Sequence, residues 1–181
     1  MAAPATIFHF KIDLSDVDRS VYESLDFRVA QHPSESLPYL MTRILAYALN
    51  YGDASFSTAG LADPDSPALS APDEFGGVKL WIEIGNPSPR KLHKASKAAK
   101  KVKVYTYKNP DALIRTVAAE QVHRASEIEL YSFTAEFLEA LANTMDRENR
   151  WSILNQGGAI MVTVGEKALH GELSVHSFEQ A

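Results

Sequence analysis

The run Val78–Gly85, with the sequence VKLWIEIG, constrains the fold more than any other stretch of the chain. Side chains of a β-strand alternate between two faces, and every second residue from Val78 to Ile84 is apolar. One face is therefore wholly apolar, which predicts a central strand. The other face carries Glu83, and a carboxylate is costly to bury unless a cation, a donor or a metal pairs with it. Glu83 is expected either to form a structural salt bridge or to belong to a functional site.

A second carboxylate, Asp73, lies ahead of this strand, after Pro72 and before a Gly76-Gly77 turn. A hairpin at that turn is expected to bring Asp73 near Glu83. Two carboxylates are what a hard divalent cation such as Mg²⁺ usually takes from a protein. This spacing therefore favours a metal site at the hairpin.

A basic helix is predicted directly after the strand. Ser88 is a suitable N-cap and Pro89 a suitable first helical residue. The basic residues that follow are Arg90, Lys91, Lys94, Lys97, Lys100 and Lys101. With a further strand over 102–107, this gives a β-α-β unit, which implies parallel pairing and a right-handed crossover. The basic stripe suits phosphate binding, and it is equally typical of a solvated helix face.

The N-terminal half before this unit reads as two strands and a helix. Residues 5–14 alternate as a strand, and residues 21–30 are expected to pair with them as a hairpin. Helical spacing of apolar residues predicts a helix that Ser34 caps and that runs to about Tyr51. A short strand over 56–61 and a turn-rich loop over 62–71 follow, in which Asp63 and Asp65 are more typical of turns than of ligand sites.

The C-terminal half is predicted to alternate helices and strands before it ends in a meander. A helix begins at Asn109-Pro110, a strand covers 127–133, and Thr134 caps the next helix. The meander comprises strands at 151–154, 159–164 and 172–178. The predicted fold class is α/β (α+β), a mixed β-sheet flanked by helices in a single domain over residues 1–181.

Composition excludes several classes of function. The chain has no cysteine, so it has no disulfide, thiol nucleophile or cysteine-ligated zinc. Its six histidines show no zinc-ligand spacing. No signal peptide and no run of about 18 apolar residues is visible, which predicts a cytoplasmic protein that does not enter a membrane. The net charge of −5 argues against a protein that is basic overall, although the basic stripe keeps nucleic acid as a partner.

Several motifs resemble those of known families. Pro72-Asp73, a nine-residue gap and Glu83-x-Gly85 resemble the PD-(D/E)xK nuclease superfamily, with Gly85 where that motif has lysine. The whole chain resembles the YaeQ family of bacterial proteins. The residues that carry this resemblance are ATIFHFKIDL near the N-terminus, HPSE at 32–35, LWIEIGNP at 80–87 and the following RKLHKA. The resemblance implies a nuclease-like core flanked by the N-terminal hairpin and the C-terminal meander.

The resemblance also implies a site and an activity. Asp73 and Glu83 would bind Mg²⁺ or Mn²⁺, and Glu35 would complete the metal site, although a carboxylate in the first turn of a helix is also a common dipole partner. Because Gly85 replaces the motif lysine, a helix lysine would take its catalytic role, with Lys94 ranked first and Lys91 second. The residues expected to contact nucleic acid are Arg90, Lys91, Lys94, Lys97 and Lys101. The expected function is a metal-dependent nuclease, and the alternative is a non-catalytic binding module with the same fold.

Overall fold

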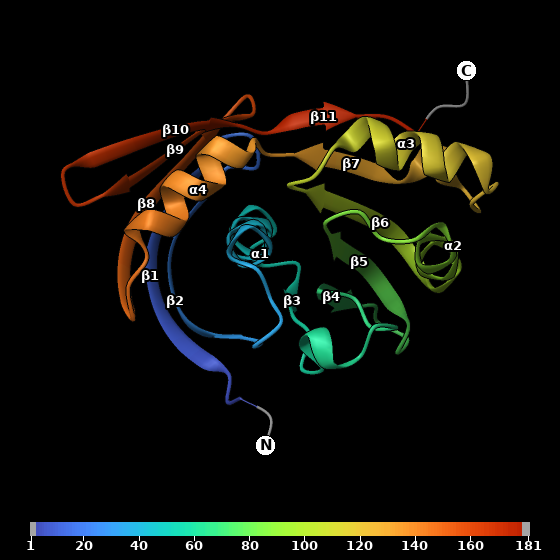
Figure 1. Ribbon diagram of the computed structural model, residues 1–181, viewed down its shortest axis with the longest axis horizontal. Coiled ribbons are helices and arrows are strands. Elements are labelled where there is room, and N and C mark those ends of the chain that lie inside the picture. Colours follow the sequence, from blue (N-terminus) through green and yellow to red (C-terminus); the bar gives the residue numbers. More distant parts are fainter. Residues whose placement is uncertain (1–2, 179–181) are drawn as a thin grey trace. The chain divides into compact units, whose positions relative to one another are not determined.

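The computed structural model describes residues 3–178, which form two compact units, each built on a mixed β-sheet (Figure 1). The first unit joins the chain up to residue 41 with residues 133–173. The second unit joins residues 42–132 with the segment that starts at residue 174. Four α-helices lie within the described residues: α1 (Leu37–Leu49), α2 (Pro89–Ala98), α3 (Pro110–Ala119) and α4 (Ala135–Thr144).

The first unit contains a sheet with the strand order β10-β9-β8-β1-β2. Its strands are β1 (Thr6–Asp16), β2 (Val21–Gln31), β8 (Glu148–Gln156), β9 (Ala159–Val164) and β10 (Lys167–Glu172). The predicted N-terminal hairpin of β1 and β2 is confirmed, and so are the first two strands of the meander, β8 and β9. The third strand of the meander is β10 at Lys167–Glu172, where the prediction had 172–178. The hairpin and the meander are joined by parallel pairing of β1 with β8. Hairpin and meander thus share a sheet of their own, where the sequence had predicted one mixed sheet for the whole chain.

Alternation along β1 explains which face of this sheet is buried. Phe8, Phe10, Ile12 and Leu14 are buried, whereas the residues between them are partly or fully exposed. Helix α4 packs against β10, and its residues Phe137, Leu138 and Leu141 are buried. The predicted cap at Thr134 is confirmed, because its hydroxyl accepts a bond from the backbone N–H of Phe137. The opposite face of β1 carries the polar and charged side chains of His9, Lys11 and Asp13.

The second unit contains a sheet with the order β11-β7-β6-β5-β4-β3. Its strands are β3 (Ser55–Phe56), β4 (Leu69–Pro72), β5 (Val78–Ile84), β6 (Ala99–Thr106), β7 (Glu129–Ser132) and β11 (Ser174–His176). The predicted β-α-β unit is confirmed, because β5 and β6 pair in parallel on either side of α2. Strand β7 extends this parallel run, and β4 pairs with β5 antiparallel.

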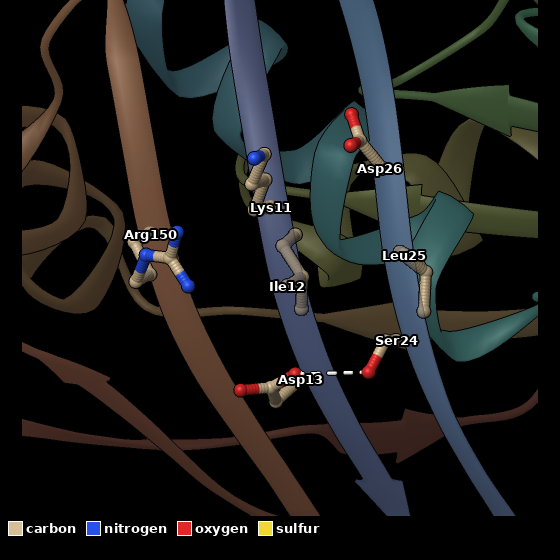
Figure 2. A pocket seen from close by; sticks show the side chains of 7 residues that line it. All are labelled: Lys11, Ile12, Asp13, Ser24, Leu25, Asp26 and Arg150. Atoms are coloured by element: carbon tan, nitrogen blue, oxygen red, sulfur yellow. Dashed lines mark hydrogen bonds between the residues drawn. The ribbon is translucent and has the colours of Figure 1, made fainter.

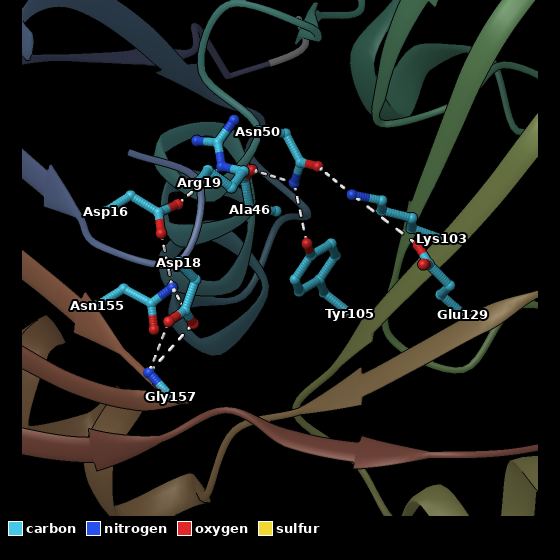
Figure 3. A network of polar contacts seen from close by, with 10 residues as sticks. All are labelled: Asp16, Asp18, Arg19, Ala46, Asn50, Lys103, Tyr105, Glu129, Asn155 and Gly157. Carbon is cyan, nitrogen blue, oxygen red and sulfur yellow. Dashed lines mark hydrogen bonds and ion pairs between the residues drawn. The ribbon is translucent and has the colours of Figure 1, made fainter. Parts of the chain in front are cut away.

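Strand β5 is buried on both faces, as is usual for a parallel strand inside a sheet. One face joins a hydrophobic core with α2 and α3, which includes Trp81, Leu92, Val104 and Leu113. On the opposite face, Asn50 donates from its amide to the Tyr105 hydroxyl, which binds the residue after α1 to β6 (Figure 3). Glu83 lies on the same face as Trp81, so it is buried beneath α2.

Three predicted elements differ from the structure. The strand expected over 56–61 is reduced to Ser55–Phe56, followed by a 3₁₀ turn at Gly60–Ala62. The helix expected from Ser34 begins at Leu37, because Glu35 accepts the backbone N–H of His32 and closes a turn. The last predicted strand, over 172–178, is wrong as a member of the meander: its residues 174–176 form β11, which pairs with β7 in the second sheet.

The helices of the described part of the chain are short. The longest, α1, has 13 residues, and no helix within residues 3–178 is long and apolar enough to cross a membrane.

Candidate functional site

Glu83 is the central residue of the candidate site, near the C-terminal end of β5. It is 3% exposed, and both of its carboxylate oxygens are bonded within the protein. The indole N–H of Trp81 donates to Oε1 at 2.6 Å, and the Nζ atom of Lys91 lies 3.0 Å from Oε2. A buried carboxylate is therefore held between a donor on its own strand and a cation on α2.

The start of α2 explains why Lys91 reaches this carboxylate. Ser88 caps the helix by accepting the backbone N–H of Lys91, and Pro89 occupies the first turn, as predicted. Leu92 and Ala95 are buried, so the side of α2 next to Lys91 packs on the sheet. Lys91 is half-buried, whereas Lys94 is exposed and lies 3.7 Å from Asp65. The lysine ranked second from the sequence, Lys91, is thus the one that contacts Glu83.

The electrostatics of Glu83 reflect a balance between burial and its two partners. Burial raises the pKa of Glu83 above its ordinary value, while the Lys91 charge and the Trp81 hydrogen bond lower it. The net shift of the Glu83 pKa is upward, so the effect of burial outweighs the effects of Lys91 and Trp81. A carboxylate in this state can act as a proton acceptor closer to neutral pH than an exposed glutamate can.

Two acidic residues that the sequence assigned to a turn, Asp63 and Asp65, lie near the lysines of α2. Asp63 accepts bonds from the Ser66 hydroxyl at 2.5 Å and from the backbone N–H of Asp65 at 2.9 Å. These bonds, together with the charges of Lys94 and Lys91, lower the pKa of Asp63. The turn-forming role is therefore confirmed for Asp63. The loop that contains Asp63 and Asp65 also lies near the first turns of α2, and no pattern in the sequence indicates this contact.

Asp73 lies at the other end of β5, which corrects the expected pairing with Glu83. Asp73 pairs with Gly77 across the turn, and its Oδ1 accepts the backbone N–H groups of Phe75 and Gly77. These two bonds and the charge of Lys100, whose Nζ is 3.5 Å away, lower the pKa of Asp73. From Gly77 to Glu83 the strand advances by six residues, which is about 20 Å of extended chain. Asp73 therefore closes the hairpin and is not a neighbour of Glu83.

The third expected acid, Glu35, belongs to the first unit, whereas Asp73 and Glu83 belong to the second. Glu35 is buried, and its side chain accepts the backbone N–H of His32 while its carbonyl accepts the amide of Gln31. The expectation that Glu35 lies in the first turn of the helix is therefore wrong: the first turn of α1 has no acidic residue, and Glu35 belongs to the turn before it.

Gly85 has a backbone reason to be glycine. Its φ is +85°, a left-handed conformation that side-chain-bearing residues rarely adopt, and its N–H donates to the Tyr105 carbonyl. A Cβ at this position would meet the Tyr107 ring at 3.5 Å, which is ordinary contact. The conformation, more than the space, therefore disfavours a lysine where the nuclease motif has one.

The predicted nucleic-acid contacts do not form one surface. Arg90, Lys94 and Lys97 are exposed at helical spacing on one side of α2, and Lys91 turns inward to Glu83. Lys101 lies on β6, where it forms an ion pair of 3.1 Å with Glu129. It alternates with Val102, whose side chain is in the core under α2, so Lys101 is on the opposite face of the sheet.

The ligand set expected for Mg²⁺ or Mn²⁺ does not fit one ion in this arrangement. Asp73 is separated from Glu83, and the Glu83 oxygens are bonded to Trp81 and Lys91. Across residues 3–178, no three acidic or histidine side chains are grouped so that they could hold a metal. The chemistry that this site offers therefore rests on a buried carboxylate, a lysine and a basic helix face.

Comparison with known proteins defines the family. The model of the family described as YaeQ protein matches residues 1–173. A protein of Escherichia coli (strain K12) named Uncharacterized protein YaeQ is 36% identical over 115 residues, which is 63% of this chain and 63% of that protein. The crystal structure of YaeQ protein from Pseudomonas syringae has a TM-score of 0.86 at 30% identity and covers 96% of this chain and 97% of its own. The YaeQ protein from Xanthomonas axonopodis pv. citri has a TM-score of 0.87 at 27% identity, with coverage of 96% and 98%. The chain belongs to the YaeQ family.

Proposed function

We propose that this chain is a nuclease-like protein that binds the phosphodiester backbone of nucleic acid and cleaves it beside Glu83. The observation that carries this proposal is the buried pair of Glu83 and Lys91, 3.0 Å apart, at the end of a central strand. Buried ion pairs bring little net stability, so a pair at this position needs a further reason. Phosphate chemistry supplies one, because it requires a fixed positive charge next to a proton acceptor.

Each residue of the pair has a chemical role in this proposal. Lys91 is the more exposed partner, so its ammonium group would stabilise negative charge on the phosphoryl oxygens. Glu83, whose pKa burial raises, would accept the proton of the attacking water. The water oxygen then forms the new bond to phosphorus while the bond to the leaving sugar oxygen breaks. Trp81 holds the Glu83 carboxylate through its indole N–H.

The basic side of α2 would bind the nucleic acid. Arg90 and Lys97 are exposed, and neither has an ion-pair partner among residues 3–178. Lys94 has only a loose partner, Asp65 at 3.7 Å. Lysine and arginine side chains of this kind neutralise phosphates, which makes the binding dependent on salt.

A non-catalytic nucleic-acid-binding module is the second candidate. It is favoured because both Glu83 oxygens are already bonded and Gly85 replaces the motif lysine in a backbone conformation that suits glycine. In this case the Glu83–Lys91 pair would orient α2, and the basic side of the helix would carry the whole function.

The experiment that tests the proposal measures binding and cleavage separately. Single-stranded and double-stranded DNA and RNA, fluorescently labelled, are titrated with the protein and incubated with Mg²⁺, with Mn²⁺ or with a chelator. We expect binding that weakens with salt, and we expect Arg90→Gln with Lys97→Gln to weaken it by about tenfold or more. Glu83→Gln is expected to retain binding and to lose cleavage. Lys167→Gln, an exposed lysine on β10, is the matched control for a change in charge.

The outcomes separate the two candidates. Cleavage that disappears in Glu83→Gln supports the nuclease. Binding without cleavage in any cation supports the binding module, and absence of binding contradicts both. Calorimetry with Mn²⁺ and Mg²⁺ on the wild type and Glu83→Gln tests metal binding separately from cleavage. A metal ion held at this site would need the Glu83 carboxylate, so the variant should not bind it.

A further inference from the structure

The polar face of the first sheet contains a hollow of about 220 Å³ over β1, β2 and β8 (Figure 2). The charged and polar side chains at its rim are Lys11, Asp13, Ser24, Asp26 and Arg150. All five residues are exposed and belong to the first unit, whereas Glu83 and Lys91 belong to the second.

Two cations face each other across neighbouring strands of this hollow. Lys11 on β1 is directly paired in register with Arg150 on β8. Like charges on neighbouring strands of one sheet face repel each other. Within residues 3–178, neither side chain forms a hydrogen bond or an ion pair. Asp26 lies directly opposite Lys11 on β2, whereas the register partner of Arg150 is the cation Lys11.

The neighbouring acids have other bonded partners, and the charge of Lys11 also acts on Asp26 and lowers its pKa. His9 lies between Asp26, at 2.5 Å, and Glu148, at 2.7 Å. Asp13 accepts the Ser24 hydroxyl at 3.1 Å through Oδ1. Its other carboxylate oxygen points away from Ser24 toward β8 in Figure 2 and has no bonded partner among the described residues.

The hollow thus combines two cations that form no ion pair within residues 3–178 with an Asp13 carboxylate oxygen that accepts no hydrogen bond there. Lys11 and Asp13 are two residues apart on the same strand and face, which corresponds to about 7 Å. A ligand that complements both must carry an anionic group next to a cationic donor. A phosphate dianion would satisfy the cations but would add negative charge beside Asp13 and Asp26.

We propose that this hollow binds a free α-amino acid as its zwitterion. The ligand carboxylate lies between Lys11 and Arg150, where the guanidinium group can bind it with two parallel hydrogen bonds. The ligand ammonium group donates to the free oxygen of Asp13. Both ends of the ligand are needed, which separates this site from a general anion site.

The test uses L-alanine and two blocked forms of it as probes. The protein over residues 1–181, labelled with ¹⁵N, is titrated with L-alanine, L-alaninamide and N-acetyl-L-alanine while the amide signals of β1 and β8 are followed. L-alaninamide lacks the carboxylate, and N-acetyl-L-alanine lacks the ammonium group. We expect a dissociation constant on the order of 1 mM for L-alanine and about tenfold weaker binding for each blocked form.

Variants connect the binding to the proposed contacts. Arg150→Gln and Asp13→Asn are each expected to weaken alanine binding by about tenfold, while Lys167→Gln on β10 leaves it unchanged. These are exposed substitutions, and unchanged amide spectra of the free variants show that the fold is kept. The proposal is overturned if alanine leaves the β1 and β8 signals unmoved, if a blocked form binds as well as alanine, or if the two variants bind like the control.

Discussion

Lys91 determines whether the Glu83 carboxylate can remain ionised inside the second unit. Burial raises the pKa of Glu83, and Lys91 is the strongest influence in the opposite direction. Removing the charge by Lys91→Met should therefore raise the pKa of Glu83 further and leave a buried charge without its cation at high pH. We expect a loss of about 3 kcal/mol in the free energy of unfolding at about pH 8. Urea unfolding of the variant and the wild type measures this loss.

The pH dependence of this effect follows from the direction of the shift. A carboxyl whose pKa is higher in the folded protein stabilises the fold below its unfolded pKa, and that contribution is lost as pH rises through the folded pKa. The penalty of Lys91→Met should therefore be small at about pH 4, where Glu83 is protonated, and should grow toward about pH 8. Lys94→Met is the matched control, because Lys94 and Asp65 are both exposed and their pair should change stability by less than about 0.5 kcal/mol. An equal loss at both pH values would show that Glu83 ionisation is not the cause.

Gly85, the residue after β5, has a backbone conformation that disfavours any side chain. Substitutions at Gly85 therefore test why this chain has glycine where the nuclease motif has lysine. We expect Gly85→Ala to lose about 1 kcal/mol or more of unfolding free energy, because its φ of +85° is strained for any L-residue. Gly85→Lys should lose a similar amount without gaining a contact that Lys91 already makes. Gly76→Ala is the control, since Gly76 has a φ of +84° with no atom within 4 Å of an added Cβ. If Gly85→Ala loses several times more than Gly76→Ala, packing against Tyr107 is responsible and the backbone is not.

The elements that the sequence predicted well are those whose interactions lie within a short stretch of chain. The β-α-β unit is continuous from β5 to β6, and the cap at Ser88 and the strand pattern are visible within it. The hairpin of β1 and β2 is likewise local. Alternation predicts the face of a side chain, and for β5 it correctly separated Glu83 from the apolar positions on the opposite face.

The site was harder to predict because alternation does not give register or rotamer. Asp73 and Glu83 are in the same hairpin, yet the turn at Gly76-Gly77 places them at opposite ends of β5. Lys91 and Lys94 are one helical turn apart, so only the rotation of α2 on the sheet decides which one reaches Glu83. The loop with Asp63 returns to α2 through contacts that no local pattern contains. Register counted from the turn was the one signal that could have excluded Asp73.

At the scale of the whole molecule, the first sheet depends on two distant parts of the chain. Strand β1 has β2 on one side and β8 on the other, and the parallel register with β8 joins residues such as Ile12 and Trp151. Isolated two-stranded hairpins are at best marginally stable in water. A fragment of residues 1–132 retains β1 and β2 but lacks β8, β9 and β10, so its hairpin should not remain folded.

Hydrogen exchange of this fragment tests the dependence of the first sheet on its C-terminal strands. We expect the amide of Ile12 in β1 to exchange at close to the unfolded rate in the fragment, whereas it is protected in the full chain. Val104 in β6 is the internal reference, because its strand neighbours β5 and β7 remain in the fragment. Addition of a separately expressed segment of residues 133–181 should restore protection at Ile12, since it supplies β8. Protection of Ile12 in the fragment alone would mean that the hairpin is stable without β8, and the first unit would then be assembled around the hairpin and not around the pairing of β1 with β8.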